Sequence, residues 1–327
     1  MEAAIILTYR CLNKCYMCNT WKYPSKIEEE FSPFLLEKLP RLDFVNITGG
    51  EPTLRDDLDE IIRILRKKAK RIVISTNGYL TQKIVDLAVK NKDLGIRISI
   101  EGLSAANDEL RGIKDGFDHG LRTLLELKRI GIKDIGFGIT VSDRNARDML
   151  ELYQLAKALQ VEFATAVVHN SYYFHKWDNA INDKDSVIAC FQELICELLK
   201  TNKIKNWYRA YFNHGLIEYI RGRKRLLACG AGRDMFFLDP HGEIRPCNGA
   251  DSESIDNSFG NLKDNDFEQL WFGEKARKIR QKLVNCPKQC WMIGTASPAM
   301  KRCVLTPTIW VLKNKLSLTL GKRTCIT

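Results

Sequence analysis

The chain has 327 residues, of which 45% are hydrophobic and 28% are charged, and its formal net charge is +11. This composition is typical of a folded globular protein and excludes an intrinsically disordered chain. The sequence has no long uncharged apolar run and no secretory signal at its start. We therefore expect a cytoplasmic protein whose 11 cysteines are thiols or metal ligands rather than disulfides.

Short apolar or β-branched runs alternate with amphipathic stretches through the first half of the chain. The expected strands are residues 4–8, 44–48, 71–75, 95–100, 134–141 and 161–167. The expected helices between them are residues 57–69, 81–91, 117–130 and 147–159. Such alternation indicates βα units joined by right-handed crossovers. We therefore predict an α/β fold in which a parallel sheet curls into a partial (βα)6 barrel of the TIM type.

Three cysteines, Cys11, Cys15 and Cys18, follow the first expected strand with the spacing C-x3-C-x2-C. Three thiolates leave one iron of a four-iron cluster open, whereas four thiolates close the cluster of an electron carrier. The second expected strand ends in a Gly-Gly-Glu-Pro run at residues 49–52, where paired glycines permit a ligand to approach the backbone closely. Ligands bind at the carboxyl ends of parallel strands, so both motifs are expected in one site.

In these two motifs the chain resembles the radical S-adenosylmethionine (SAM) enzymes, whose cluster loop and second strand carry the same patterns. The resemblance implies a [4Fe-4S] cluster on the three cysteines, with the methionine part of SAM bound to the open iron. It also implies an external one-electron reductant of the flavodoxin or ferredoxin type. The residues that the resemblance places at SAM are Met17, Gly49, Gly50, Glu51, Pro52, Asn77, Ser99, Glu101, Arg111 and Asn145.

Several of these residues have an ordinary structural explanation. Ser99, Glu101, Arg111 and Asn145 are residue types that close strands as caps and turn formers, and this alternative stays open for each. The five histidines show no metal-ligand spacing. Only His169, which follows the sixth expected strand, is placed at the same edge of the sheet.

The pattern is helical from residue 183 to about 222 and becomes rich in Gly, Cys and Pro after residue 226. This change predicts a barrel domain over residues 1–225 and a small α+β domain over residues 226–327. The run 239–242, Asp-Pro-His-Gly, reads as a hairpin turn between two short strands. Two cysteines flank this turn, and two more follow it.

The spacing of Cys229 and Cys247 resembles the start of the SPASM and twitch modules, which carry auxiliary iron-sulfur clusters. The implied ligand set is Cys229, Cys247, Cys286 and Cys290, with Cys303 as an open alternative. Because the fuller SPASM cysteine group is absent, we expect the shortened twitch form with one auxiliary [4Fe-4S] cluster. A structural zinc site is the alternative, since zinc ribbons are also held by two pairs of thiolates. Cys190 and Cys196, six apart on an expected helix, are expected to be buried rather than ligands.

Three classes of function follow from this sequence. The favoured one is a radical SAM oxidoreductase that oxidises, epimerises or forms a bond on a sugar or cyclitol-type small molecule, with a peptide-modifying maturase as its alternative. The second is an RNA-modifying enzyme, suggested by charge alone and without a recognised nucleic-acid module. The third is a non-catalytic iron-sulfur or zinc protein.

The last part of the chain contains both apolar and basic side chains. Residues 309–320 combine Trp, Val and Leu side chains with Lys313 and Lys315, which is typical of a helix that lies along a membrane surface. We therefore consider peripheral membrane contact through residues 304–327. The alternative is a terminal helix or strand packed on the barrel.

Overall fold

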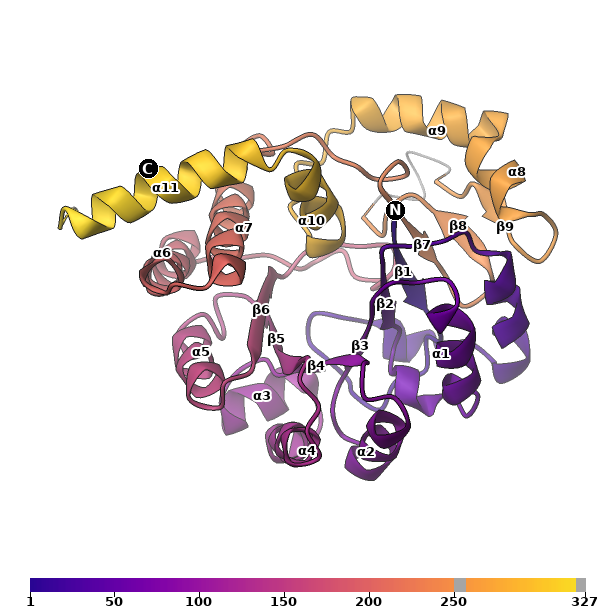
Figure 1. Cartoon of the computed structure of the whole chain (residues 1–327), viewed down its shortest axis with the longest axis horizontal. Helices are drawn as coiled ribbons and strands as arrows, with labels where there is room; N and C mark the ends of the chain where they lie inside the picture. The colour runs from indigo at the N-terminus through magenta and orange to yellow at the C-terminus, as the bar shows by residue number, and fades with distance from the viewer. Residues whose placement is uncertain (250–256, 322–327) are drawn as a thin grey trace.

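The computed structural model describes residues 1–249 and 257–321. Its centre is a nine-stranded sheet in the order β6-β5-β4-β3-β2-β1-β7-β8-β9, shown with its surrounding helices in Figure 1. The first six strands run parallel and are β1 (Glu2–Ile6), β2 (Phe44–Thr48), β3 (Ile72–Thr76), β4 (Gly95–Ser99), β5 (Ile135–Val141) and β6 (Glu162–Val167). Every expected strand is present within about two residues of its expected bounds. The sheet curls but does not close, which confirms the partial barrel.

Five helices connect these strands, and four of them were expected. They are α1 (Leu58–Arg66), α2 (Thr81–Lys90), α3 (Ser104–Arg111), α4 (Gly116–Arg129) and α5 (Asp148–Ala158). The sequence did not predict α3, because its eight residues bury only one large apolar side chain, Leu110. Short 3-10 helices lie in the connections on either side of β2: η1 (Thr20–Lys22), η2 (Ile27–Glu29), η3 (Pro33–Lys38) and η4 (Pro52–Leu54).

Three more strands, from the second part of the chain, extend the sheet beyond β1. After α6 (Lys184–Lys200) and α7 (Ile204–Ile220), strand β7 (Met235–Leu238) pairs in parallel with β1. Strands β8 (Glu243–Arg245) and β9 (Gly260–Asn261) then pair antiparallel. The expected hairpin turn is confirmed, with Asp239 accepting the N–H groups of His241 and Glu243. Strand β1, set between β2 and β7, is buried along its whole length. The domain boundary near residue 225 stays a prediction, and one sheet spans it.

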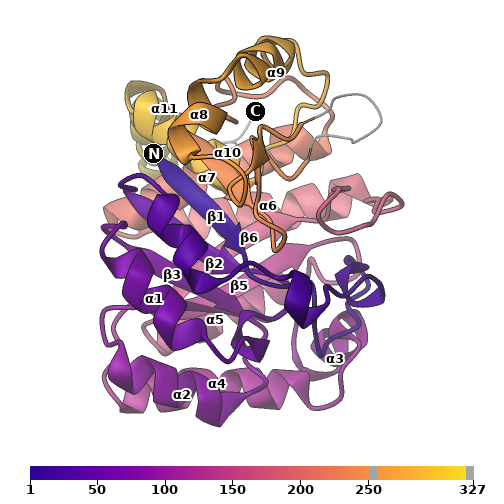
Figure 2. The ribbon, with the colours of Figure 1, turned by 90° about the vertical axis from the view of Figure 1, so that its right-hand side faces the viewer.

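The remaining helices are α8 (Phe267–Phe272), α9 (Glu274–Val284), α10 (Ile293–Arg302) and α11 (Leu305–Thr319). They gather at the end of the molecule opposite α2 and α4, as Figure 2 shows. Helix α10 packs on β1 and β7, and α11 lies along α6 and α7. Cys190, on α6, packs partly buried against the main core.

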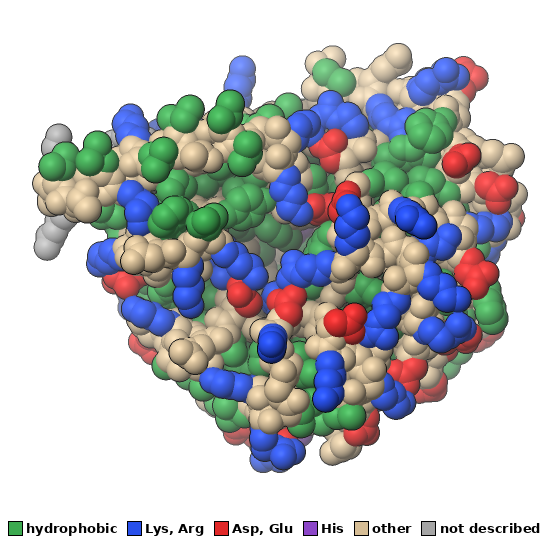
Figure 3. All heavy atoms as spheres, viewed as in Figure 1, with side chains coloured by type: hydrophobic (Ala, Val, Ile, Leu, Met, Phe, Trp, Pro, Cys, Tyr) green, Lys and Arg blue, Asp and Glu red, His purple; other side chains and the backbone are tan. Residues whose placement is uncertain are grey.

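Helix α11 has an apolar outer surface, visible as the green side chains along it in Figure 3. No helix within residues 1–249 and 257–321 is long and apolar enough to cross a membrane. The last part of the expected membrane-contact segment, residues 322–327, lies outside the described residues.

Candidate active site

The cysteine loop, residues 7–19, leaves the carboxyl end of β1 and packs directly on Gly49 and Gly50. The Gly50 N–H donates to the Thr8 carbonyl at 2.7 Å. A Cβ atom at Gly50 would stand 2.2 Å from the Arg10 carbonyl oxygen, and one at Gly49 would stand 2.7 Å from that of Thr8. The sequence predicted that these glycines admit a ligand. In the structure they admit the backbone of the cysteine loop, and a role in binding SAM stays a prediction.

Glu51 is fully buried, and its carboxylate accepts four hydrogen bonds. The donors are the N–H and hydroxyl of Thr53, at 3.1 and 2.7 Å, the Thr76 hydroxyl at 2.8 Å and the Asn77 N–H at 2.7 Å. Asn77 in turn donates through Nδ2 to Asn13 Oδ1 at 2.6 Å. Glu51 and Asn77 therefore join the ends of β2 and β3 to the cysteine loop. Sequence reasoning missed Asn13, whose only signal is its place between two cysteines.

Glu101, Arg111 and Asn145 form a second buried group at the same edge. Arg111 Nη1 donates to Glu101 Oε1 at 2.9 Å, and the Thr140 N–H donates to Glu101 Oε2 at 2.6 Å. Asn145 Nδ2 donates to the Glu101 carbonyl at 2.6 Å. At the end of α3 the Arg111 carbonyl accepts the Lys14 N–H at 3.1 Å, so this group also holds the cysteine loop. The structure therefore brings Glu101, Arg111 and Asn145 together, and their contact with SAM stays a prediction.

The three thiols of the loop are largely buried, and all three lie near Arg111. Burial raises the pKa of Cys11 to about 12 and that of Cys15 to about 11, and it also raises the pKa of Cys18. Arg111 opposes this rise at all three thiols. Its Nε is buried and has no hydrogen-bond partner among the described residues. Three thiols beside a buried guanidinium with a spare donor fit an anionic iron-sulfur cluster and a bound carboxylate.

The three other residues that the resemblance placed at SAM, Met17, Pro52 and Ser99, lie nearby. Pro52 is buried and begins η4. Met17 is 8% exposed and packs with Leu110 and Val168 against Cys15. Ser99 is the last residue of β4 and is half-buried. Their contact with SAM stays a prediction.

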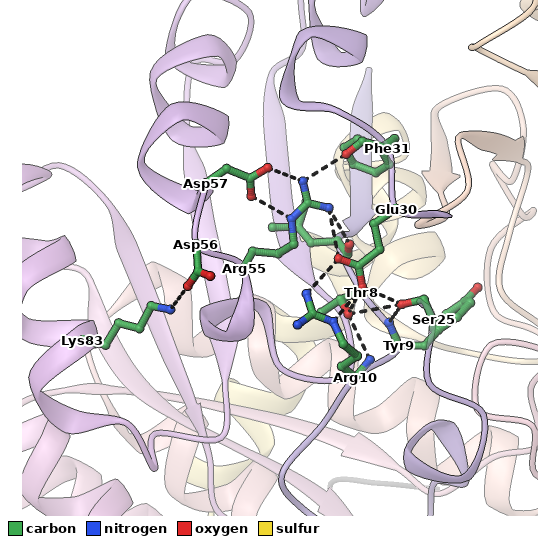
Figure 4. Close-up of polar contacts among 11 residues, drawn as sticks. Thr8, Tyr9, Arg10, Ser25, Glu30, Phe31, Arg55, Asp56, Asp57 and Lys83 are labelled. Atoms are coloured by element: carbon green, nitrogen blue, oxygen red, sulfur yellow. Dashed lines mark hydrogen bonds and ion pairs between the residues drawn. The ribbon is translucent and has the colours of Figure 1, made fainter. Parts of the chain in front are cut away.

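A buried ion network, drawn in Figure 4, anchors the cysteine loop on its other side. The Glu30 side chain is 1% exposed and accepts two hydrogen bonds from Arg10, at 3.0 and 2.9 Å, and one from Ser25 at 2.7 Å. Arg55 Nη1 lies 3.4 Å from Glu30 and its guanidinium also pairs with Asp57 at 2.6 Å. Arg10 directly precedes Cys11, so this network fixes where the cysteine loop begins. Sequence reasoning missed this network.

The four cysteines of the expected auxiliary-cluster set line a second site. Cys229 precedes β7, Cys247 follows β8, Cys286 follows α9 and Cys290 precedes α10, and all four line one cavity of about 850 Å³. Cys303 is the C-cap of α10 and does not line this cavity. No three His, Cys, Asp or Glu side chains of the described ranges converge on one metal ion. A four-iron cluster does not require this, because each thiolate binds a different iron.

Cys290 is held by its neighbours. Its carbonyl accepts a hydrogen bond from Arg225 Nη1. The next residue, Trp291, is 1% exposed and donates through Nε1 to the Phe212 carbonyl on α7 at 2.9 Å. A Cβ atom at Gly215 would stand 2.2 Å from the Trp291 ring, so α7 needs glycine there for the ring to fit.

The cavity contains polar atoms without partners and an excess of positive charge. His169 Nδ1 lies 3.2 Å from the Val167 carbonyl, which can only accept, so His169 Nε2 is itself an acceptor. Burial lowers the pKa of His169, which keeps the ring neutral. His169 Nε2 and Asn179 Oδ1 are buried without a partner among the described residues. The lining, as far as the structure describes it, contains no Asp or Glu but five cations: Lys184, Lys224, Arg225, Arg233 and Lys288.

Comparison with known families agrees with both sites. A family model described as the radical SAM superfamily matches residues 5–156. Another, described as the SPASM iron-sulfur cluster-binding domain, matches residues 229–292. The chain belongs to the radical SAM superfamily. The matches confirm the expected cofactors of this radical SAM chain, which are SAM with a [4Fe-4S] cluster and an auxiliary iron-sulfur cluster. The SPASM match contains all four cavity cysteines and ends before Cys303.

The curated relatives are enzymes with several kinds of product. Fe-coproporphyrin III synthase of Methanosarcina barkeri is 35% identical over 46% of this chain and 39% of that protein. Pre-heme d1 synthase of Dinoroseobacter shibae is 27% identical over 82% of this chain and 72% of that protein. Mycofactocin maturase MftC of Mycolicibacterium smegmatis is 26% identical over 84% of this chain and 71% of that protein. This chain therefore spans less than half of the first relative and more than two thirds of the other two.

Solved structures share the fold. The chain anSMEcpe with bound AdoMet superposes with a TM-score of 0.65 at 15% identity, over 94% of this chain and 98% of that chain. Streptococcus suis SuiB superposes with a TM-score of 0.63 at 19% identity, over 89% of this chain and 72% of that chain. These likenesses confirm the partial barrel with a C-terminal module.

Proposed function

We propose that this radical SAM chain is an oxidoreductase that cleaves SAM at the cysteine loop and directs the resulting radical at a substrate held in the four-cysteine cavity. This proposal rests on two residues that line the cavity and also pack near the cysteine loop. Val168 and Ile181 line the cavity and also belong to the apolar cluster that contains Met17 and contacts Cys15. The cavity therefore lies against the cysteine loop on one side and contains the second cysteine set on the other.

Cys11, Cys15 and Cys18 would hold the loop cluster, which would supply the electron that cleaves SAM to the 5′-deoxyadenosyl radical used for hydrogen abstraction from the substrate. The chain positions these groups. Glu51 and Asn77 fix the strand ends, and Arg111 offers its spare Nε to a carboxylate. The cavity volume of about 850 Å³ falls in the range of about 300–1,000 Å³ found for small-molecule sites. A substrate there lies close to both cysteine sets, which suits removal of a second electron by the auxiliary cluster.

The cavity lining favours an anionic substrate that also donates hydrogen bonds. Arg233 already pairs with Asp234, and Arg225 and Lys288 donate to backbone carbonyls. Carboxylate or phosphate groups of a substrate would balance the two remaining lining cations, Lys184 and Lys224. His169 Nε2 and Asn179 Oδ1 are acceptors, so they fit hydroxyl or amide donors on the same substrate. An acidic small molecule, such as a phosphorylated or carboxylated sugar, meets both demands.

A peptide substrate is the second candidate, and several relatives support it. Mycofactocin maturase MftC and the subtilosin biosynthesis protein AlbA of Bacillus subtilis align with 84% and 86% of this chain. SuiB has been solved bound to its precursor peptide SuiA. An acidic peptide segment would satisfy the same cations.

The test is SAM cleavage by the whole chain, reconstituted anaerobically with iron and sulfide and reduced with dithionite. We expect 5′-deoxyadenosine from the wild type and none from Cys15→Ala, whereas Cys229→Ser retains SAM cleavage because its cysteine lies in the other set. Deuterium transfer into 5′-deoxyadenosine from labelled acidic sugars or labelled acidic peptides then separates the two substrate classes. A reduced, iron-loaded protein that forms no 5′-deoxyadenosine would refute the proposal.

A further inference from the structure

Helix α11 leaves a continuous row of large apolar side chains in solvent. These residues, spaced three or four apart, expose between 60% and 72% of their surface and define the α11 stripe: Leu305, Ile309, Leu312, Leu316 and Leu320. This spacing puts them on one face of the helix. Single exposed apolar residues are normal on a protein surface, whereas a contiguous row marks a surface that binds something. Figure 3 shows the stripe at the rim of the molecule.

The opposite face of α11 is packed against the protein, so α11 already has a buried face and the stripe is a second apolar face in solvent. Val311 is 5% exposed, and the Trp310 ring stacks on His214 of α7 with centroids 4.8 Å apart. Lys315 Nζ donates to the carbonyls of Leu199 and Thr201 at the end of α6, at 2.7 and 3.1 Å. These contacts fix the rotation of α11 and direct the stripe outward.

The positive charge of the chain is concentrated in the last part of its sequence. Residues 275–327 contain twelve Lys and Arg and no Asp or Glu, so they carry +12. Since the whole chain carries +11, residues 1–274 carry −1. Lys313 is exposed within α11, and Lys301 and Arg302 are exposed at the end of α10 that leads into it. Five of the twelve lie on α9, which Figure 1 shows apart from α11, and Lys301 and Arg302 pair with Glu2 and Asp234. The exposed cation set within α11 beside the stripe is Lys313.

We propose that α11 docks on a membrane that contains anionic lipid, with the stripe in the interfacial region and the exposed Lys313 toward the headgroups. Charge complementarity selects this occupant. A second copy of the chain would bring a net charge of +11 against +11 and be repelled. Nucleic acid would match the charge but leave the five apolar side chains in water. An anionic bilayer surface satisfies both features at once.

The experiment is flotation of the full chain with vesicles of phosphatidylcholine, with and without phosphatidylglycerol. The stripe variant is Ile309→Gln with Leu316→Gln, since glutamine keeps helix propensity. The matched control is Val89→Gln with Leu125→Gln, on α2 and α4 at the far end, where the wild-type side chains are 52% and 44% exposed. We expect the wild type and the control to float with anionic vesicles and to be released by salt. Loss of two inserted side chains should weaken the stripe variant at least tenfold.

Circular dichroism melts of both variants confirm that each is folded. Equal flotation of the stripe variant and the wild type would overturn the proposal, as would wild-type flotation that is the same with neutral vesicles. So would sedimentation that shows a wild-type dimer dissociated by the stripe substitutions, because the stripe would then mediate self-association. Binding of the wild type to polyglutamate without binding to vesicles would instead assign the surface to an acidic protein.

Discussion

Replacing Glu30 by glutamine should loosen the cysteine loop and destabilise the fold. The carboxylate is 1% exposed and pairs with Arg10 and Arg55, of which Arg55 is also buried, with a side-chain exposure of 6%. Removing one partner of a buried ion pair costs about 3–5 kcal/mol, because the other charge stays buried without balance. Arg55 keeps its second partner, Asp57, so we expect the lower end, about 3 kcal/mol.

The assay is urea unfolding of the metal-free chain, with Asp59→Asn as control. Asp59 forms an exposed ion pair with Lys90, and such pairs contribute about 0–1 kcal/mol. After reconstitution, Glu30→Gln should also hold less iron at the loop, because the residue before Cys11 is no longer fixed. Glu30→Gln unfolding with the same free energy as Asp59→Asn would refute this reasoning.

The pH dependence supplies a second readout of the same substitution. Burial alone would raise the pKa of Glu30, but its hydrogen bonds from Arg10, Ser25 and Thr8 outweigh this and lower it. A lowered pKa contributes stability that is complete above the unfolded value of about 4.3 and is lost as the pH falls through the folded value. The stability difference between wild type and Glu30→Gln should therefore shrink on acidification and stay constant above about pH 6.

Two further predictions concern the second cysteine set. Gly215→Ala should cost about 1–3 kcal/mol and weaken the auxiliary cluster, because the new Cβ would overlap the Trp291 ring beside Cys290. Gly138→Ala is the control, since a Cβ there meets nothing within 4 Å, and comparable unfolding curves for the two variants would contradict the packing argument. Cys290→Ser should lower the iron of the reconstituted chain from about eight to about four per chain, whereas Cys303→Ser should leave it unchanged. Loss of iron in Cys303→Ser but not in Cys290→Ser would assign the fourth ligand to Cys303.

The sequence predicted those parts of the site that local spacing encodes. The three loop cysteines lie within eight residues, and the Gly-Gly-Glu-Pro run directly ends a strand, so both could be placed at one sheet edge. Arg111 was predicted to be in the site, but the helix that carries it was not. The contacts of Arg111 could not be predicted, because Glu101 and Lys14 contact it only in the folded chain.

The parts that sequence reasoning missed depend on contacts between distant segments. Glu30 is one of three consecutive glutamates, residues 28–30, and the sequence does not indicate which of their carboxylates is buried. Strand β7 pairs with β1 across more than 200 residues, and four residues of apolar sequence do not identify that partner. Helix α11 is apolar on two faces, so the pattern alone left open whether it packs on the barrel or faces outward. In the structure it does both.

The central claim is that the cysteine loop holds a cluster with an iron left open for SAM. Electron paramagnetic resonance of the reduced double variant Cys229→Ser/Cys247→Ser tests it most directly, because only the loop cluster should then contribute a signal. Addition of SAM should change the spectrum of that cluster, since SAM binds the iron that no thiolate occupies. A spectrum that is the same with and without SAM would contradict the account.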